Sequence, residues 1–94
     1  KAVKDLIYQI TDMMENAVLM IGIELDGKAQ LHVGISKGIA GKEGLHAGNL
    51  IRELAKAIGG GGGGQPFYAS AGGKNPSGID KALADGRAAI ASLS

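Results

Sequence analysis

The sequence predicts an α/β fold of the mixed α+β kind: a small mixed β-sheet with an antiparallel hairpin and a right-handed β-α-β crossover, packed with about three helices. Apolar side chains recur at helical spacing in three stretches and alternate in strand-like stretches between them. An Asp26-Gly27 turn predicts the hairpin. A helix then separates the second and third strands, an order that normally gives parallel strands joined by a right-handed crossover.

The first half of the chain predicts one helix and the hairpin. Residues 1–16 carry apolar side chains on one helical face and predict an amphipathic leading helix. Residues 17–25 are rich in β-formers, and residues 30–36 alternate between polar and apolar side chains. The alternation predicts a wetter face on the second strand, with His32 facing solvent.

The second half predicts a helix, a short strand and a last helix. Residues 47–58 carry a clean apolar stripe that ends at a glycine run. A strand is predicted over 67–71, where Tyr68 either stacks on a base or packs under a helix. Asn75 and Pro76 are typical of a helix start, with asparagine as N-cap and proline at the first helical position.

Length and composition indicate one domain over residues 1–94, with a leading helix at 1–16 and a globular part at 17–94. The chain is 45% hydrophobic and only 20% charged, which excludes the composition of a disordered protein. It has no cysteine, so a disulfide scaffold, a thiolate zinc site and a thiol nucleophile are excluded. It begins at Lys1 without methionine, and we expect a fragment of a longer chain.

Charge is nearly balanced but unevenly placed. Residues 1–36 carry three basic and five acidic side chains, a sum of −2, whereas residues 37–94 carry seven and four, a sum of +3. A basic excess of this size in the second half favours an anionic partner but does not establish one.

Glycine is the unusual residue, with 17 in the chain and an unbroken run at 59–64. A flexible linker is the ordinary interpretation of such a run. Cutting the chain there would leave about 30 residues, too few to fold unaided, so we expect an internal loop of one domain. Glycine lets a backbone approach a ligand closely, and successive amides can converge on an anion such as phosphate.

Known nucleotide-binding patterns do not fit the glycines. A dinucleotide fingerprint needs a strand before it and a helix after it, and here the order is reversed. A P-loop fails because Gly64 precedes Gln65 and Pro66. The pair Gly72-Gly73 before Lys74 is the better local anion site, and an ordinary capped turn is an equal alternative.

A polar stripe on the second helix is the other candidate surface. It consists of Lys37, Lys42, His46, Asn49, Arg52 and Lys56. The alternative is a solvated helix face whose charge is offset by Glu43 and Glu53. The two histidines, His32 and His46, do not form a metal-ligand pattern, and the sequence contains no locally supported carboxylate pair or catalytic triad.

The segment GGGGGGQPFYASAGGKNPSGIDKAL at 59–83, preceded by VGISKG at 33–38, resembles the DHH-associated domain in the form found at the C-terminus of alanyl-tRNA synthetases. The resemblance covers nearly the whole chain from Ala17 onward. It implies the globular part of the C-terminal domain of a class II alanine-tRNA ligase, which binds the outer corner of tRNA and helps couple aminoacylation with editing.

The resemblance also implies a setting. The partners are alanine-accepting tRNA and the upstream catalytic and editing domains of the same chain, with a homodimer left open and no membrane. ATP, magnesium and zinc belong to the upstream domains, no cofactor is expected in this segment, and the location is cytoplasmic.

Together these observations predict a tRNA- or phosphate-binding set without catalytic or metal-ligating members: Lys37, Lys42, His46, Asn49, Arg52, Gly62, Gly63, Gly64, Gln65, Ser70, Gly72, Gly73 and Lys74. The chain departs from the family where members often carry a lysine inside the glycine run and an arginine at the position of Gln65. Two alternatives stay open: a nucleic-acid or substrate-binding domain of a DHH-family phosphoesterase, and a module that pairs subunits. The phosphoesterase branch usually places a histidine where Gln65 stands, which argues against it.

Overall fold

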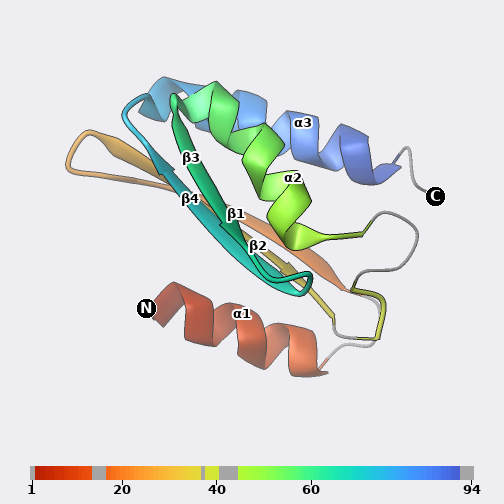
Figure 1. Cartoon of the computed structure of the whole chain (residues 1–94). Helices are drawn as coiled ribbons and strands as arrows, with labels where there is room; N and C mark the ends of the chain where they lie inside the picture. The colour runs from red at the N-terminus through yellow and green to blue at the C-terminus, as the bar shows by residue number, and fades with distance from the viewer. Residues whose placement is uncertain (1, 14–16, 37, 41–44, 92–94) are drawn as a thin grey trace.

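The computed structural model describes residues 2–13, 17–36, 38–40 and 45–91, and shows a single four-stranded sheet with helices on both faces (Figure 1). The elements in chain order are α1 (Ala2–Met13), β1 (Val18–Leu25), β2 (Lys28–Ile35), α2 (Ala47–Leu54), η1 (Ala55–Ile58), β3 (Gly60–Gly64), β4 (Tyr68–Gly73), η2 (Pro76–Gly78) and α3 (Ile79–Ala91), where η marks a 3-10 helix. The predicted α/β class, the hairpin and the three helices are confirmed.

The sheet is antiparallel throughout, so the predicted mixed sheet with a parallel pair was wrong. The strand order is β1-β2-β4-β3, and β4 pairs antiparallel with both of its neighbours. The reason is that the glycine run is not an internal loop: it forms strand β3, which reverses the chain once more before β4 begins. The helical crossover therefore joins β2 to β3, two strands that run the same way with β4 between them.

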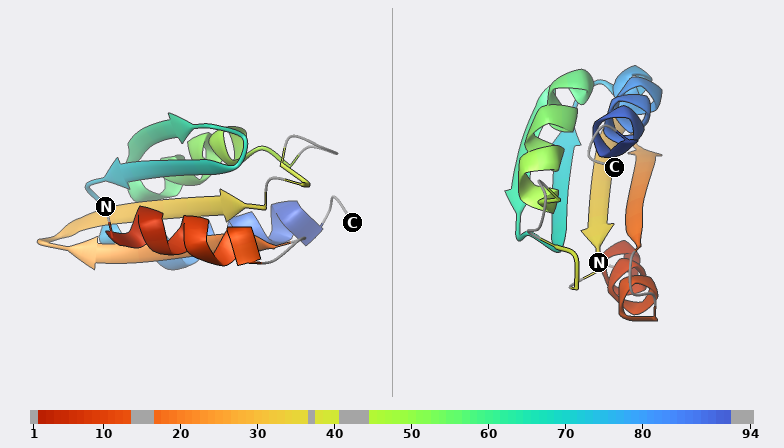
Figure 2. Two further views of the ribbon diagram at one scale, coloured as in Figure 1. Left: turned by 90° about the horizontal axis from the view of Figure 1, so that it is seen from below. Right: turned by 90° about the vertical axis from the view of Figure 1, so that its right-hand side faces the viewer.

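The helices divide unequally between the two faces of the sheet. α2 packs over β2, β4 and β3, and α3 packs mainly over β1 on the same face. On the opposite face α1 packs over β2 and β1. Figure 2 shows α1 over the β1–β2 half of that second face. α1 reaches the start of β4, where Tyr8 packs on Tyr68, and the rest of the β3–β4 half carries none of the described helices.

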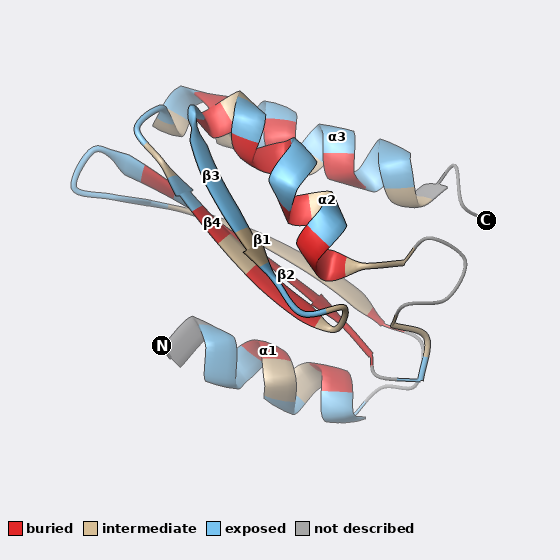
Figure 3. Ribbon diagram, in the orientation of Figure 1, coloured by how far each residue is buried: buried red, intermediate tan, exposed pale blue. Residues whose placement is uncertain are grey.

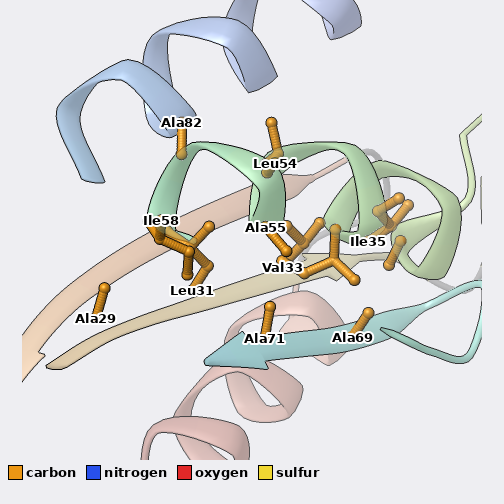
Figure 4. Close-up of a cluster of buried hydrophobic side chains, with 12 residues drawn as sticks. Ala29, Leu31, Val33, Ile35, Leu54, Ala55, Ile58, Ala69, Ala71 and Ala82 are labelled. Carbon is orange, nitrogen blue, oxygen red and sulfur yellow. The ribbon is translucent and has the colours of Figure 1, made fainter. Parts of the chain in front are cut away.

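The hydrophobic core lies between the sheet and the pair α2 and α3 (Figure 4). Burial follows the alternation predicted for β2, since Leu31, Val33 and Ile35 are each 1% exposed. Ile51 of α2 and Ile58 of η1 are completely buried against them. Figure 3 shows the resulting band of buried residues along β2, β4 and the inner sides of the helices.

α1 is held on its face by packing and by one buried hydroxyl. Ile7 is completely buried, and a Cβ on Gly34 of β2 would collide with it, so the glycine allows the helix to approach closely. Ser36 Oγ accepts a hydrogen bond from the Ala17 amide at 3.0 Å and donates one to the Thr11 carbonyl at 3.3 Å. These contacts fix α1 against the end of β2, whereas residues 14–16 at the end of the predicted leading helix lie outside the described part.

The helix ends agree in part with their sequence signals. Gly59 ends η1 in the left-handed conformation, with φ of 66°, as expected for a glycine after a helix. Asn75 stands at the N-cap position and Pro76 follows in the first turn. The Asn75 side chain does not cap a helix amide, however, because its Oδ1 accepts a hydrogen bond from Ser77 Oγ at 2.5 Å.

Alternate glycines of β3 have opposite steric surroundings. A Cβ on Gly60 would collide with the Gly72 carbonyl oxygen, and one on Gly62 with the Ser70 carbonyl oxygen. A Cβ on Gly61 or Gly63 would meet no atom within 4 Å. The close approach of β3 to β4 therefore requires glycine at some positions of the run and leaves the positions between them open.

Candidate nucleic-acid interface

A groove runs along the sheet beside α1, from the edge of this helix to the ends of β2 and β4. Its first part is lined by Lys4, Gln30, His32, Tyr68, Ser70, Ala71 and Gly72. Its second part continues to the strand ends and is lined by Lys28, Ala29, Gln30, Gly72, Gly73 and Lys74. Because the two parts share Gln30 and Gly72, we treat them as one feature, the α1-side groove.

The strand register explains why these side chains meet. In the antiparallel pairing of β2 with β4, Gln30 lies opposite Gly72 and His32 lies opposite Ser70. Side chains of alternate residues share a face of a sheet, so this set points toward α1 while the intervening residues enter the core. The strand order thus builds the groove from two segments some forty residues apart.

The groove is positively charged. Lys4, Lys28 and Lys74 are exposed, and the described residues that line the groove include no aspartate or glutamate. Lys4 Nζ also lies 5.5 Å from the ring centroid of Tyr68 and 5.7 Å from that of Tyr8, which keeps this ammonium group above the sheet. Such a surface is suited to an anion with several charges in a row.

A buried pair of polar rings closes the inner end of the groove. His32 Nδ1 lies 2.8 Å from the Tyr68 hydroxyl, and the two residues are 9% and 8% exposed. The prediction that His32 faces solvent was therefore wrong: α1 covers this part of the face. Tyr68 packs under α1 with its ring 5.4 Å from that of Tyr8, which confirms packing as the alternative to base stacking.

Burial perturbs the titration of both rings. Desolvation lowers the pKa of His32 and raises the pKa of Tyr68, so both stay neutral at physiological pH. His32 Nε2 is buried and has no hydrogen-bond partner among the described residues. A protonated ring would place a charge beneath α1 with one N–H unsatisfied.

We expect the free energy of unfolding to fall as pH is lowered through the unperturbed histidine pKa of 6.5, because the unfolded state then binds more protons than the folded state. The contribution of His32 is fully present above 6.5 and stops changing below its lowered folded-state pKa. Urea unfolding between about pH 8 and about pH 5 measures this slope. His32→Gln should reduce it, and an unchanged slope in this variant would contradict the burial of a neutral ring.

The structure places the predicted α2 residues away from the α1-side groove, on the other face of the sheet. Asn49 and Arg52 are exposed on α2. His46 caps the helix, with Nδ1 accepting the Asn49 amide at 3.1 Å. Lys56 lies 3.3 Å from Glu53, so the ion pair reduces the positive charge of this helix face. Lys37 and Lys42 lie outside the described residues.

The turn between β3 and β4 docks onto the start of α2. The Ala47 amide donates to the Pro66 carbonyl at 2.9 Å, and the Gly48 amide donates to the Gln65 carbonyl at 3.2 Å. The amides that could have formed an anion site at this helix end therefore bind the β3–β4 turn. Gln65 itself is exposed next to Gly64.

Some backbone amides of the junction after β4 also donate hydrogen bonds within the protein and are not free to bind an anion. The Asn75 amide donates to the Ile58 carbonyl at 2.9 Å and the Gly78 amide to the Asn75 carbonyl at 3.1 Å. Lys74 remains exposed beside Gly73, and both line the α1-side groove. Within the predicted set, the structure thus brings together Ser70, Gly72, Gly73 and Lys74.

The groove also contains three residues that the tRNA- or phosphate-binding set predicted from the sequence lacks: Lys4, Lys28 and Gln30. The alternation of β2 contains the signal for two of them, because residues 28 and 30 share the polar face with residue 32. Lys4 carries no such signal, since its position above Tyr68 depends on where α1 docks.

The described part of the chain contains neither a metal-ligand cluster nor a helix able to span a membrane. Its histidine, aspartate and glutamate side chains form no group of three that could hold a metal ion. Its helices include none with the length and apolar character needed to cross a membrane.

Fold and groove together define a small α/β domain with a basic groove beside α1, on the face of the sheet opposite α2 and α3. Comparison with known proteins gives its family: the DHHA1 domain matches residues 1–92. The chain is 48% identical over 81 residues to an alanine–tRNA ligase of Christiangramia forsetii, covering 86% of this chain and 9% of that protein. It is 45% identical over 83 residues to an alanine–tRNA ligase of Cytophaga hutchinsonii, covering 88% of this chain and 10% of that protein.

A solved structure agrees with these matches. The C-Ala domain of Aquifex aeolicus alanyl-tRNA synthetase superposes with a TM-score of 0.76 at 30% identity, covering 84% of this chain and 69% of that one. The chain belongs to the DHHA1 domain family, in the form that ends alanyl-tRNA synthetases. It spans about a tenth of the length of the curated relatives it matches.

Proposed function

We propose that this chain is the tRNA-binding C-terminal module of an alanyl-tRNA synthetase. In this role it holds the outer corner of alanine-accepting tRNA and helps couple aminoacylation with editing in the cytoplasm. The ligation of alanine with ATP, together with the magnesium and zinc that serve ligation and editing, belongs to upstream domains of the same chain.

The single observation that supports RNA binding most strongly is the composition of the α1-side groove. Exposed Lys4, Lys28 and Lys74 surround it, and its lining, as far as the structure describes it, includes no carboxylate. Lysine ammonium groups along a groove neutralise successive phosphates and release counterions, which is the main source of affinity for a nucleic-acid backbone. Among the predicted residues, Ser70, Gly72, Gly73 and Lys74 lie here, and we assign the main RNA contact to this face.

The predicted α2 residues form a second, separable candidate surface. His46, Asn49 and Arg52 lie on the opposite side of the sheet from the groove, near Gln65 and the β3–β4 turn. One face of a duplex cannot contact both sides of the sheet without wrapping around the β3 edge. Variants on each side therefore distinguish the two surfaces.

The experiment is a salt series of tRNA(Ala) binding, measured by fluorescence anisotropy. Replacing Lys28 and Lys74 together by alanine should weaken binding and reduce the slope of log affinity against log salt by about one unit per lysine. The matched control removes the same charge from the other face, with Lys81→Ala and Arg87→Ala on α3, where Lys81 already pairs with Asp85 at 2.9 Å.

The outcomes separate the surfaces clearly. The control variant should keep the wild-type slope, because its two side chains lie on the face opposite the groove. A smaller slope of log affinity against log salt in Arg52→Ala, with the wild-type slope in the Lys28 and Lys74 variant, would show that the RNA contact lies on α2 and not in the groove. Absence of tRNA binding by the unmodified chain at about 50 mM salt would refute the proposed function.

A further inference from the structure

We propose that the inner part of the α1-side groove holds a single nucleotide whose base has left its stack, with the base on the sheet and its phosphate at Lys4. The proposal rests on the proposed RNA binding and adds the kind of contact. Its structural basis is the wall formed by Lys4 and Tyr68 beside a floor of small and polar residues.

The polar groups of the groove match a base edge better than they match phosphate alone. Gln30 offers a carboxamide with a donor and an acceptor, and Ser70 offers a hydroxyl. His32 lies at the bottom of this part of the groove, where its Nδ1 is paired with the Tyr68 hydroxyl and its Nε2 is buried, so the contacts to a base come from Gln30 and Ser70. A site for phosphate requires donors only, whereas these groups supply both donors and acceptors, as the edge of an unstacked base requires.

The floor of the groove leaves room for a flat ring. Within the described part of the chain, a Cβ on Gly72 would have only the Ala29 carbonyl oxygen within 4 Å, at 3.9 Å, so the space above this residue is open. The absence of a side chain lets a planar ring rest directly on the peptide groups of β4. A methyl group at this position would fit the protein and occupy the place of the base.

The charges define where the backbone of that nucleotide lies. Lys4 stands at the rim of the inner part, above Tyr68. Lys28 and Lys74 stand around the adjoining part, which shares Gln30 and Gly72 with it. One phosphate at Lys4 and its neighbours at the other two lysines would let an RNA strand run along the groove while one base turns inward.

The first test uses small probes and NMR spectroscopy of the whole 94-residue chain. Guanosine, adenosine, cytidine and uridine 5′-monophosphates are titrated separately, with ribose 5-phosphate as the matched probe that lacks a base. We expect at least one nucleotide to shift the amides of Gln30, Ser70 and Gly72 more than ribose 5-phosphate does. Equal shifts with ribose 5-phosphate and all four nucleotides would overturn the proposal and leave a phosphate site.

The second test uses tRNA(Ala) and variants. Gly72→Ala should lower the affinity several-fold without changing the salt slope, because the phosphate contacts remain. Gln30→Ala should also lower the affinity several-fold without changing the salt slope. Because Gln30 is exposed, this variant keeps the test valid even where Gly72→Ala disturbs folding. Gln9→Ala on α1 is the matched control for Gln30→Ala, since Gln9 is also an exposed glutamine and is not among the residues that line either part of the groove.

These outcomes separate the inference from the proposed function. Wild-type affinity in both Gly72→Ala and Gln30→Ala, with tRNA binding and its lysine dependence intact, would overturn the nucleotide site alone. Failure of the unmodified chain to bind tRNA would refute the proposed function, whereas nucleotide shifts confined to the groove would still support the site.

Discussion

Replacing Gly62 by alanine is expected to lower the free energy of unfolding by about 1–3 kcal/mol, because the new methyl group has no space. A Cβ at this position would collide with two neighbouring residues of β4, with the carbonyl oxygen of Ser70 and with Ala71. β3 would have to move away from β4, and the hydrogen bonds that join them would lengthen. The edge of the sheet beside the α1-side groove would be distorted as well.

The neighbouring Gly61 provides the control of opposite sign. Nothing lies within 4 Å of a Cβ there, so alanine should leave stability unchanged or raise it by up to about 1 kcal/mol through the unfolded state. Thermal unfolding measures both variants, and for a chain of this size each kcal/mol corresponds to about 4–8 °C. Equal melting temperatures for the two variants would contradict the close pairing of β3 with β4.

Ile51→Ala is expected to destabilise the fold more strongly, by about 2–5 kcal/mol, because it opens a cavity in the middle of the core. Ile51 of α2 is completely buried and belongs to the same core cluster as Val33 and Ile35 of β2. Alanine is a good helix former, so the loss would come from packing and not from helix propensity. A change of this size is a large part of the total stability of a small domain.

Leu6→Ala on α1 is the matched control for that variant. Leu6 also lies in a helix but is 49% exposed, so its removal should cost much less than that of Ile51. Urea unfolding of the two variants gives the comparison directly. A loss at Leu6 as large as that at Ile51 would place the main core on the α1 face, contrary to the burial described above.

The sequence predicted the parts of the fold that depend on local pattern. The Asp26-Gly27 turn, the alternation of residues 30–36 and the apolar stripe of residues 47–58 each correspond to the expected element. These signals succeed because the spacing of apolar side chains directly reflects which face is buried. The apolar stripe of residues 47–58 corresponds to two elements, the α-helix α2 and the 3-10 helix η1, and apolar spacing does not show where one changes to the other.

The glycine run is where local pattern failed. Glycine has low strand propensity, so nothing in its composition predicted β3. The strand forms because β4 and α2 lie against it, and at Gly60 and Gly62 a larger residue would collide with β4. Missing this strand also gave the wrong direction for the pairing of β2 with β4, since each added strand reverses the chain.

Only part of the candidate site could be predicted from the sequence, because the rest depends on how distant segments pack together. The glycine pair and lysine before a helix start predict an anion site with Ser70, Gly72 and Lys74, and these residues lie together in the α1-side groove. Lys4 and Lys28 became part of the site only through the docking of α1 and the antiparallel register. The assignment of His32 to solvent failed because the covering helix comes from a distant part of the sequence.

Mapping tRNA(Ala) onto the chain by NMR titration decides whether RNA binds the α1-side groove or the α2 surface. With the α1-side groove as the main RNA contact, we expect the largest amide changes at Gln30, Ser70, Gly72 and Lys74, weakening as salt is raised. Changes centred on Asn49 and Arg52 of α2, with the α1-side groove unaffected, would contradict it.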